Sequence, residues 1–397
     1  MARIGIAGAG VLGRQLAWQL GRAGHAVTVF DPAPGPQAPA TGSLAQRSAH
    51  AAGFTAAGML SPIAELDNAG PAMARLGWRS LALWRGIAND LRGAGCSAPL
   101  FAQHGSLLLA HGADLGTASR VLSRLQAATT LAAELPAPQP LDRASLATLE
   151  PAVKPGMHAW LLPGEAQVMS RDMLTALAAY APNVHWCWGE RVARVDPDQI
   201  ILADGDVLLF DLSIDTRGVG ARPGMPVRGV RGEVVWLHAP GVRLQRPLRL
   251  LHPRHRVYIV PRPGDLFVVG ASEIESEDRS PVSLSSAVEL MAAAQSVLPE
   301  LTEARIVHLE TNLRPALPDN EPRIEHREGL LRINGLYRHG WLLAPSLVQD
   351  ALAALGLPPA PLRGFPPPVP EGGHSQRPGE ARSAAVLDHT PARVTPC

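Results

Sequence analysis

Charge is scarce in this sequence, and the charge that is present is balanced. Charged residues make up 18% of the 397 residues, and 36 basic side chains are matched by 35 acidic ones, which leaves a formal net charge of +1. Domains that bind nucleic acids or anionic membrane surfaces usually carry a clear positive excess. We therefore expect no nucleic-acid partner and no electrostatic attachment to a membrane.

Cysteine and long apolar runs are scarce as well. The three cysteines, Cys96, Cys187 and Cys397, lie far apart without a CxxC pair, which argues against a zinc knuckle, a redox pair or a disulfide framework. No apolar run approaches the roughly 18 residues that a membrane-spanning helix needs. These features predict a cytoplasmic protein with no integral membrane segment and no metal site.

The material for a folded core is nevertheless ample. Hydrophobic residues make up 46% of the chain, which excludes wholesale disorder. At roughly 100–200 residues per domain, the length predicts two to three domains or one large composite domain. The exception is the C-terminal end, where the proline-rich run PPAPLRGFPPPVP leads into a polar stretch. We predict that residues 358–397 form a disordered tail.

The first thirty residues have the pattern of a β-α-β unit. Residues 3–7 (RIGIA) and 26–30 (AVTVF) predict strands, and residues 11–23 carry apolar side chains at helical spacing. Between the first strand and the helix lies the sequence GAGVLG, which is a GxGxxG motif, and Asp31 ends the second strand. This order of elements is typical of a dinucleotide-binding site.

Each glycine of the motif has a physical task in such a site. Gly8 allows the tight turn, Gly10 lets the backbone approach a pyrophosphate, and Gly13 lets helix and strand pack closely. The helix N-terminus offers amide donors and a positive dipole to the phosphates. Asp31 is expected to accept a hydrogen bond from the adenosine ribose, which argues against NADP but does not separate NAD from FAD.

After Asp31 the pattern departs from a plain series of β-α units. Residues 32–55 predict a loop, residues 72–135 are mostly helical apart from a strand at 105–110, and residues 171–181 predict a helix. Strand patterns follow at 184–188, 191–195, 199–203, 207–214, 233–238, 256–261, 266–271, 305–309 and 330–334, with helices at 284–297 and 341–356. The long β region predicts an interleaved plan of two domains.

Four later segments carry a family resemblance. They are AAGML at 56–60, VYIVPR at 257–262, LRPALPD at 313–319 and YRHGWLLAP at 337–345. In this order, and after the GxGxxG motif, they resemble the D-amino-acid oxidase-like family of flavoproteins, and within it the glycine oxidase branch associated with thiazole synthesis. The resemblance covers about residues 3–356 and implies FAD as the cofactor.

The resemblance also implies the fold, which is of the α/β (α+β) class. A Rossmann-like FAD-binding domain would consist of residues 1–70, 161–225 and 311–357. It would be interleaved with an antiparallel-sheet substrate domain of residues 71–160 and 226–310.

The resemblance further implies the cofactor contacts. Asp31 would contact the ribose, and the backbone of Val192 would contact the adenine. The residues that would contact the pyrophosphate are Gly8, Gly10, Val11, Leu12 and Gly13. The residues that would contact the flavin ring are Ala57, Gly58, Met59, Tyr337, Arg338, His339, Gly340, Trp341 and Leu342. The helix from about Trp341 would point its positive N-terminus at the ring, which stabilises an anionic reduced flavin. Some relatives attach the flavin to a cysteine, but no cysteine lies between residues 188 and 396, so we expect noncovalent FAD.

Three residues are the catalytic candidates implied by the resemblance. Arg314 lies in a predicted turn before Pro315, and its planar guanidinium can hold an amino-acid carboxylate with two parallel hydrogen bonds. Tyr258 would add a hydroxyl donor to the same carboxylate. Arg338 would lie near both flavin and substrate.

The sequence departs from the family pattern in places. Arg256 stands where the family often has histidine, Arg217 stands where small apolar residues are common, and Ser272 stands where relatives have methionine or threonine. Glu65 near the pocket mouth would either favour a substrate amine or simply begin a helix. His339 is expected to contact through its backbone rather than act as a base.

The function implied by this resemblance is the oxidative deamination of glycine or a small D-amino acid with oxygen. The products would be an imine or keto acid, ammonia and hydrogen peroxide, with a supply role in thiamine biosynthesis. The alternatives are a flavin dehydrogenase with a non-oxygen acceptor, a tRNA-modifying FAD oxidoreductase, and a flavin-binding scaffold without turnover. The balanced charge argues against tRNA, and Arg314 with Tyr258 argues against the scaffold. A homo-oligomer is compatible with all of these.

Overall fold

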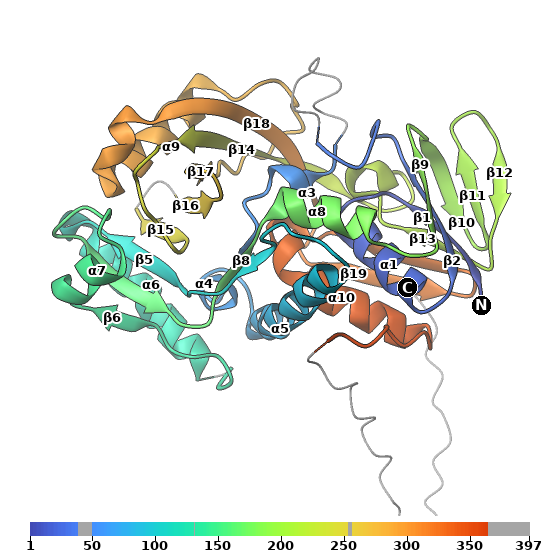
Figure 1. Ribbon diagram of the computed structural model, residues 1–397, viewed down its shortest axis with the longest axis horizontal. Helices are drawn as coiled ribbons and strands as arrows, with labels where there is room; N and C mark the ends of the chain where they lie inside the picture. The colour runs from blue at the N-terminus through green and yellow to red at the C-terminus, as the bar shows by residue number, and fades with distance from the viewer. Residues whose placement is uncertain (39–49, 131, 253–255, 364–397) are drawn as a thin grey trace, which may run out of the picture.

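The structure is a computed structural model that describes residues 1–38, 50–130, 132–252 and 256–363 (Figure 1). Its elements form two large sheets that lie beside each other, with helices α5 and α10 below the junction in the view of Figure 1. No helix among the described residues is both long and apolar enough to cross a bilayer.

The first large sheet has six strands in the order β19-β20-β13-β1-β2-β9. Its strands are β1 (Arg3–Ala7), β2 (Ala26–Asp31), β9 (Val184–Trp188), β13 (Leu212–Asp215), β19 (Arg323–Arg327) and β20 (Leu330–Asn334). All neighbours run parallel except β19, which is antiparallel to β20. The predicted β-α-β unit is therefore the centre of this sheet, as the alternation of buried strand and amphipathic helix requires.

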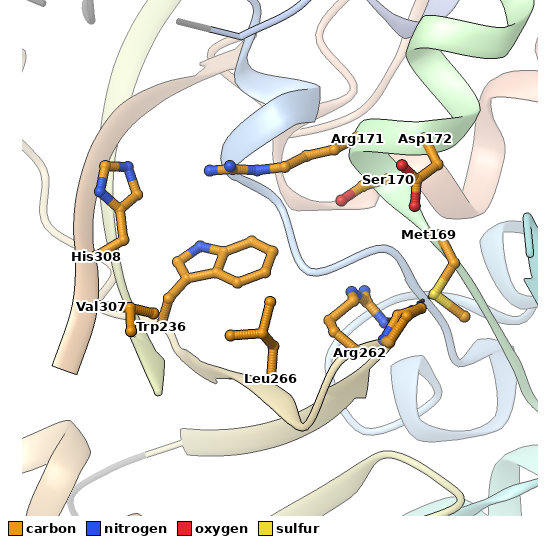
Figure 2. Close-up of a pocket in the computed structure, with 10 residues that line it drawn as sticks. Met169, Ser170, Arg171, Asp172, Trp236, Arg262, Leu266, Val307 and His308 are labelled. Carbon is orange, nitrogen blue, oxygen red and sulfur yellow. Dashed lines mark hydrogen bonds between the residues drawn. The ribbon is translucent and has the colours of Figure 1, made fainter. Parts of the chain in front are cut away.

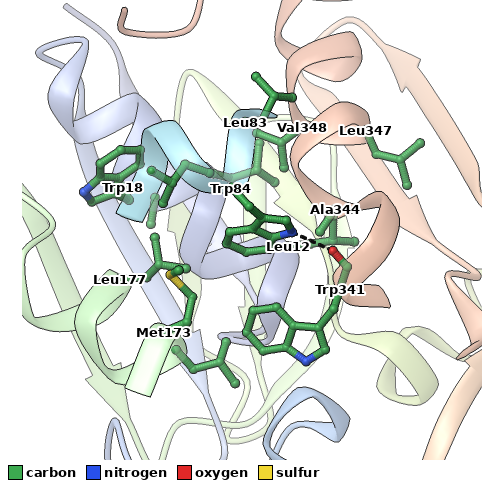
Figure 3. Close-up of a cluster of buried hydrophobic side chains, with 14 of the residues drawn as sticks. Leu12, Trp18, Leu83, Trp84, Met173, Leu177, Trp341, Ala344, Leu347 and Val348 are labelled. Atoms are coloured by element: carbon green, nitrogen blue, oxygen red, sulfur yellow. Dashed lines mark hydrogen bonds between the residues drawn. The ribbon is translucent and has the colours of Figure 1, made fainter. Parts of the chain in front are cut away.

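Helices cover one face of this sheet, and a small β meander covers the other. The helices are α1 (Val11–Arg22), α5 (Pro71–Gly93), α8 (Ser170–Ala179) and α10 (Gly340–Ala354), and the meander consists of β10 (Val192–Asp196), β11 (Gln199–Leu202) and β12 (Val207–Leu209). Trp84 of α5 and Trp341 of α10 lie at the centre of the helical layer with ring centroids 5.2 Å apart (Figure 3). The Trp84 indole nitrogen donates to the Trp341 carbonyl at 2.7 Å, so the polar atom of this buried ring is satisfied.

The second large sheet has eight strands in the order β18-β14-β17-β16-β15-β5-β7-β6. Its strands are β5 (Ser106–Ala110), β6 (Gln139–Leu141), β7 (His158–Leu162), β14 (Arg228–His238), β15 (Leu248–Leu251), β16 (Arg256–Arg262), β17 (Leu266–Gly270) and β18 (Arg305–Ala316). Helix α9 (Leu284–Val297) packs on one face with a large apolar cluster. The opposite face carries Tyr258, Arg262 and Arg314 among its side chains, because alternate residues of a strand point to opposite faces.

The remaining elements are short. A three-stranded sheet of β3 (Met59–Leu60), β8 (Ala166–Val168) and β4 (Phe101–Ala102) and the helices α3 (Ala52–Thr55) and α4 (Pro62–Glu65) lie between the two large sheets, whereas α6 (Leu115–Thr129) and α7 (Arg143–Leu149) lie beside β5 and β6 (Figure 1). The 3₁₀ turns are at Gly112–Asp114, Gly218–Ala221, Pro299–Glu303 and Tyr337–His339.

Several sequence predictions were wrong in detail. The run 207–214 is two strands in different sheets, because the chain turns between β12 and β13. The expected loop 32–55 contains helix α3, while residues 39–49 lie outside the described part. The predicted disordered tail begins too early, because Leu362 is buried and the amide of Arg363 donates to Asp90 at 3.0 Å. Residues 364–397 lie outside the described part.

Candidate functional site

The glycine motif forms the turn between β1 and α1. Gly8 has a φ of +97°, and a Cβ on Gly13 would lie 1.8 Å from the Gly8 carbonyl oxygen, so strand and helix meet more closely than a side chain allows. A Cβ on Gly10, by contrast, would meet only the Ala51 Cβ, at 3.7 Å, among the described residues. Gly10 therefore borders space at the N-terminus of α1 that no described residue fills, which is where a pyrophosphate would lie.

Asp31 holds this turn to the end of β2. Its two carboxylate oxygens accept hydrogen bonds from the backbone amides of Ala9 at 2.6 Å and Ala33 at 2.9 Å. Burial raises the pKa of Asp31, while these two amides and the charge of Arg14 oppose the rise. A carboxylate oxygen can accept a second hydrogen bond, so Asp31 could bind a ribose hydroxyl as well as the two backbone amides. The ribose contact stays a prediction.

Arg14 is a buried cation in the first turns of α1 that sequence reasoning missed. Its Nε donates to the Ala9 carbonyl at 2.7 Å, and its Nη1 donates to the carbonyls of Pro36 and Leu174, each at 2.7 Å. Burial lowers the pKa of Arg14 to about 10, so the side chain stays charged at neutral pH. The signal in the sequence is an arginine directly after the last glycine of the motif. A fixed positive charge here would favour a diphosphate nearby.

The N-terminus of α10 meets the N-terminus of α1. Gly340 begins α10, Val11 begins α1, and a Cβ on Gly340 would lie 4.0 Å from Val11 Cγ1. Tyr337, which precedes α10, has a φ of +48°, a conformation that a non-glycine residue adopts only under constraint. The N-terminal ends of α1 and α10, which carry partial positive charge, thus lie close together. They would stabilise an anionic group bound there.

The side chains of Leu12, Trp341 and Leu342 belong to the hydrophobic core rather than to an open site. All three are buried in the cluster around Trp84. Figure 3 shows Leu12 and Trp341 in this cluster. The Trp341 indole nitrogen donates to the Gly53 carbonyl at 3.1 Å. These residues would therefore meet a cofactor through their backbone, while their side chains fix the two helices.

The segment Ala57-Gly58-Met59 lies against the eight-stranded sheet. Gly58 has a φ of +68°, and a Cβ there would lie 2.3 Å from the Val168 carbonyl oxygen. Ala57 and Met59 pack in one apolar cluster with Tyr258. The segment predicted to line the flavin is thus beside the sheet face that carries the predicted substrate residues.

Arg314 lies inside strand β18, so its predicted place in a turn was wrong. β18 continues through Pro315, because β14 pairs with it from Arg228 to His238. The neighbouring Gly232 makes room for the guanidinium, since a Cβ there would lie 2.5 Å from Arg314 Cζ. The guanidinium donates to the carbonyls of Arg231 at 3.2 Å and Ser272 at 3.0 Å. Both acceptors are neutral backbone oxygens on this face of the sheet.

Tyr258 lies on the same face, on β16. Its hydroxyl lies over Gly270 of β17, where a Cβ would come within 2.7 Å of the oxygen. Burial raises the pKa of Tyr258, while the charges of Arg314, Arg249 and Arg262 oppose the rise. The hydroxyl is thus protonated at neutral pH and able to donate.

Glu65 joins three basic side chains near the start of α10. Its Oε2 lies 2.9 Å from Arg338 Nη2 and 2.9 Å from His339 Nε2, and its Oε1 lies 3.5 Å from Arg249 Nη2. Burial alone raises the pKa of Glu65, but the hydrogen bond from His339 and the nearby charges hold it well below its usual range. The expectation that Glu65 attracts a substrate amine is not supported, because the carboxylate already serves three basic side chains. His339 contacts Glu65 through its ring nitrogen Nε2, whereas only a backbone contact was expected for this residue.

Arg249 and Glu273 complete this network, and sequence reasoning missed the contribution of both. Arg249 is the register partner of Tyr258 on β15, a strand that the sequence pattern did not predict. Glu273 Oε2 lies 3.6 Å from Arg338 Nη1, and burial together with a hydrogen bond to Glu273 raises the pKa of Tyr337 to about 12. Arg338 is therefore held between two carboxylates.

Val192 and the unusual Arg217 lie together at the end of β13. Arg217 pairs with Asp215 at 2.7 Å and donates from Nη1 to the Val192 carbonyl at 3.1 Å. Asp215 thus neutralises the charge of Arg217, and the hydrogen bond to Val192 links the meander to the parallel sheet. The contact of the Val192 backbone with an adenine stays a prediction.

The residues around the glycine motif are suited to binding FAD. Open space at Gly10, two converging helix ends and the buried Arg14 together provide a place for a diphosphate. Across the described ranges, no group of three or more His, Cys, Asp and Glu side chains is arranged to hold a metal ion.

Known proteins are similar to this chain over most of its length. A thiamine biosynthesis oxidoreductase, ThiO, of Rhizobium etli is 36% identical over 358 residues, which covers 89% of this chain and 96% of the relative. A glycine oxidase of Geobacillus kaustophilus is 26% identical over 370 residues, which covers 86% and 89%.

Solved structures share the fold. The crystal structure of glycine oxidase from Geobacillus kaustophilus matches with a TM-score of 0.73 at 26% identity, covering 89% of this chain and 95% of that one. Iminodiacetate oxidase from Chelativorans sp. BNC1 matches with a TM-score of 0.74 at 23% identity, covering 92% and 99%. The sequence model of the FAD dependent oxidoreductase family matches residues 3–352. The chain therefore belongs to the FAD dependent oxidoreductase family, and its cofactor is FAD.

Proposed function

We propose that this protein oxidises glycine or a small D-amino acid, with oxygen and water as co-reactants and a keto acid, ammonia and hydrogen peroxide as products. The observation that carries the proposal is the placement of Arg314 and Tyr258 on one sheet face, beside the segment Ala57–Met59. A guanidinium and a phenolic hydroxyl on one face suit a carboxylate.

Each polar group of the pocket has a separate task in this reaction. Arg314 binds the substrate carboxylate in a bidentate manner, and Tyr258 donates a further hydrogen bond to it. FAD, when bound, supplies the acceptor for the hydride that leaves the substrate Cα. Holding the carboxylate at two points orients the Cα–H bond toward that acceptor, which is the main contribution that such a protein makes.

The pocket also favours the neutral amine that oxidation needs. Arg314, Arg338 and Arg249 place positive charge around the site, and Glu65 is already engaged by the latter two. Positive neighbours and burial both disfavour an ammonium group and so lower the pKa of a bound amine. The substrate is therefore expected to lose its amine proton on binding.

The named relatives support the amino-acid substrate and extend the proposal. One is a glycine oxidase, and another is a thiamine biosynthesis oxidoreductase. On that basis, we propose that the product imine is supplied to a thiazole-forming step.

The test is a peroxide assay with purified, FAD-loaded protein over glycine, sarcosine, D-alanine and L-alanine. Glycine or D-alanine should give peroxide and ammonia in equal amounts, and L-alanine should give neither. Turnover with an artificial dye but not with oxygen would instead favour the dehydrogenase. No turnover with any amino acid, under either condition, would contradict the proposal.

A further inference from the structure

Charged side chains line two places on the face of the eight-stranded sheet that carries Arg314. One is a cavity of about 380 Å³ between α8 and the sheet, which Arg171, Asp172 and Arg262 border (Figure 2). The charges of this cavity are matched, because Arg171 pairs with Glu310. Asp172 and Arg262 likewise attract each other. The second place is the surroundings of Arg314, where the charges are arranged differently.

Glu273 lies close to the guanidinium of Arg314. Arg314 Nη2 donates to the Ser272 carbonyl at 3.0 Å, and Glu273 is the next residue along the chain. The planar peptide unit between these two residues places the Glu273 Cα within about 6 Å of that nitrogen. The Glu273 side chain is 49% exposed, so it borders solvent. A substrate whose carboxylate is held by Arg314 therefore lies within one side-chain length of Glu273.

Two contacts direct the Glu273 carboxylate toward the turn before α10. Its Oε2 lies 3.6 Å from Arg338 Nη1, and the Tyr337 hydroxyl donates a hydrogen bond to it. Arg338 Nη2 lies 2.9 Å from Glu65 Oε2. Both terminal nitrogens of Arg338 thus already face a carboxylate of the protein, and they are not available to a carboxylate of the substrate.

The charges near Arg314 would therefore treat one and two carboxylates on a substrate differently. The first carboxylate gains from Arg314, which contacts two neutral carbonyls of the chain. A second carboxylate would be repelled by Glu273 and would find Arg338 engaged. A neutral amide of the same size would not be repelled. Like charge at a binding site is a common source of specificity against a competing ligand.

We propose that Glu273 determines the side-chain specificity of this site, because its carboxylate rejects amino acids that carry a second carboxylate, such as aspartate and glutamate. Amino acids with a neutral side chain are accepted. The inference rests on the proposed function, since it takes Arg314 as the group that binds the substrate carboxylate.

The experiment is calorimetric titration of FAD-loaded protein with succinate and with its monoamide, succinamate. The two compounds have nearly the same size and differ in one charge, and the readout needs no turnover. We expect succinamate to bind the wild-type protein about tenfold more tightly than succinate. Added salt should reduce this preference, because Glu273 is half exposed and its charge is screened by ions.

Two variants then assign the preference to one residue. Glu273→Gln should bring the two affinities within about twofold of each other, because it removes the repelling charge and releases Arg338 Nη1. Glu275→Gln is the matched control, because it removes the same charge from the same segment. Glu275 is 66% exposed and pairs with Arg228, so this variant should keep the preference of the wild type.

Turnover provides a second measurement of the same property. The ratio of kcat/KM for D-asparagine to that for D-aspartate should be about tenfold in the wild type and in Glu275→Gln, and close to one in Glu273→Gln. The wild-type comparisons need no variant, so they test the proposal even if Glu273→Gln fails to fold.

Different results would overturn the role of Glu273 and the proposed function. Equal wild-type affinity for the two compounds, or a preference that Glu273→Gln leaves unchanged, would overturn the role of Glu273. Arg314→Ala should abolish the binding of both compounds. Binding that survives this change, or no binding to the wild type up to about 10 mM, would instead contradict the carboxylate clamp of the proposed function.

Discussion

Arg314 and Arg338 are both arginines of the proposed substrate pocket, but their partners in the structure differ. The guanidinium of Arg314 contacts two carbonyls and no carboxylate among the described residues. Arg338 lies between Glu65 and Glu273, so its charge is already matched. A substrate carboxylate therefore gains most from Arg314, while Arg338 shapes the electrostatic surroundings of the site.

Replacement of Arg314 by alanine should abolish useful turnover and leave the FAD content unchanged. The change removes two charge-assisted hydrogen bonds of about 1.5–3 kcal/mol each, which corresponds to about two to four decades in kcat/KM. Arg314→Lys should recover little, because an ammonium lacks the planar fork. Steady-state kinetics and the visible spectrum check this, and near wild-type oxidation of glycine or D-alanine by the alanine variant would rule out the clamp.

Replacement of Glu65 by glutamine should destabilise the protein and lower turnover. The buried carboxylate pairs with Arg338 and His339, so its loss leaves positive charge unmatched, at a cost of about 3 kcal/mol. Glu325→Gln is the matched control, because that carboxylate is 41% exposed and lies 4.0 Å from its partners, and it should change stability by less than about 0.5 kcal/mol. Denaturant unfolding compares the two, and equal effects would contradict the role of Glu65.

The lowered pKa of Glu65 also predicts how the stability of the protein depends on pH. The pKa of Glu65 is lowered in the folded protein, whereas a glutamate in the unfolded chain titrates near 4.5. Its stabilising contribution is therefore complete above that value and is lost as the pH falls below it toward the lowered pKa. The stability difference between wild type and Glu65→Gln should shrink on acidification below about pH 4.5. A difference that grows there would show that Glu65 is not held ionised.

At the scale of elements, β1 and α1 approach each other closely at the glycine motif. A Cβ on Gly13 would clash with the Gly8 backbone, whereas a Cβ on Gly10 has room within the protein. The two glycines look alike in the sequence, yet the structure assigns packing to one and leaves space for a ligand beside the other.

The variants Gly13→Ala and Gly10→Ala should therefore behave differently. Gly13→Ala should destabilise the FAD-free protein by on the order of 3 kcal/mol, since the backbone must shift. Gly10→Ala should leave the FAD-free protein within about 1 kcal/mol of wild type but weaken FAD binding strongly. Thermal unfolding without FAD and titration with FAD separate the two, and equal loss of stability in both variants would contradict the assignment.

At the scale of the whole molecule, the chain beyond α10 stays attached to the helical layer. Leu362 packs on Gly86 of α5, and Arg22 donates to the Pro361 carbonyl at 2.9 Å. The body of the protein thus extends to at least Arg363.

Two truncations should differ for this reason. Deletion of 366–397 should leave FAD content and turnover nearly unchanged, because that stretch is polar and lacks apolar periodicity. Deletion of 358–397 also removes the buried Leu362 and should cost about 1.5–3 kcal/mol. Thermal unfolding of both proteins is the measurement, and equal melting temperatures would show that the Leu362 contact contributes nothing.

FAD should be released intact from the whole protein by acid or heat. Cys96 is buried in the helical layer, and Cys187 lies on strand β9 of the parallel sheet, so neither is beside the segment Ala57–Met59. The purified protein should be yellow, and the supernatant after precipitation should contain all of the colour. Flavin that remains in the pellet would contradict noncovalent binding.

The sequence by itself determined what depends on neighbours along the chain. The strand at 3–7, the helix at 284–297 and the glycine turn follow from periodicity and from the steric freedom of glycine, and the structure has them at those places. The order of the four family segments was enough to identify the family and FAD. The strand at 248–251 was missed, because a short apolar run does not reveal its period.

Only the tertiary structure decided what depends on residues far apart. Glu65 and Arg338 are separated by 273 positions, and they pair because the end of α4 and the turn before α10 meet in the folded chain. Arg314 lies in a strand because β14 offers eleven residues of pairing, and Gly232 leaves space for its guanidinium. Local propensity cannot specify such contacts, because burial and charge pairing are fixed only when distant segments meet.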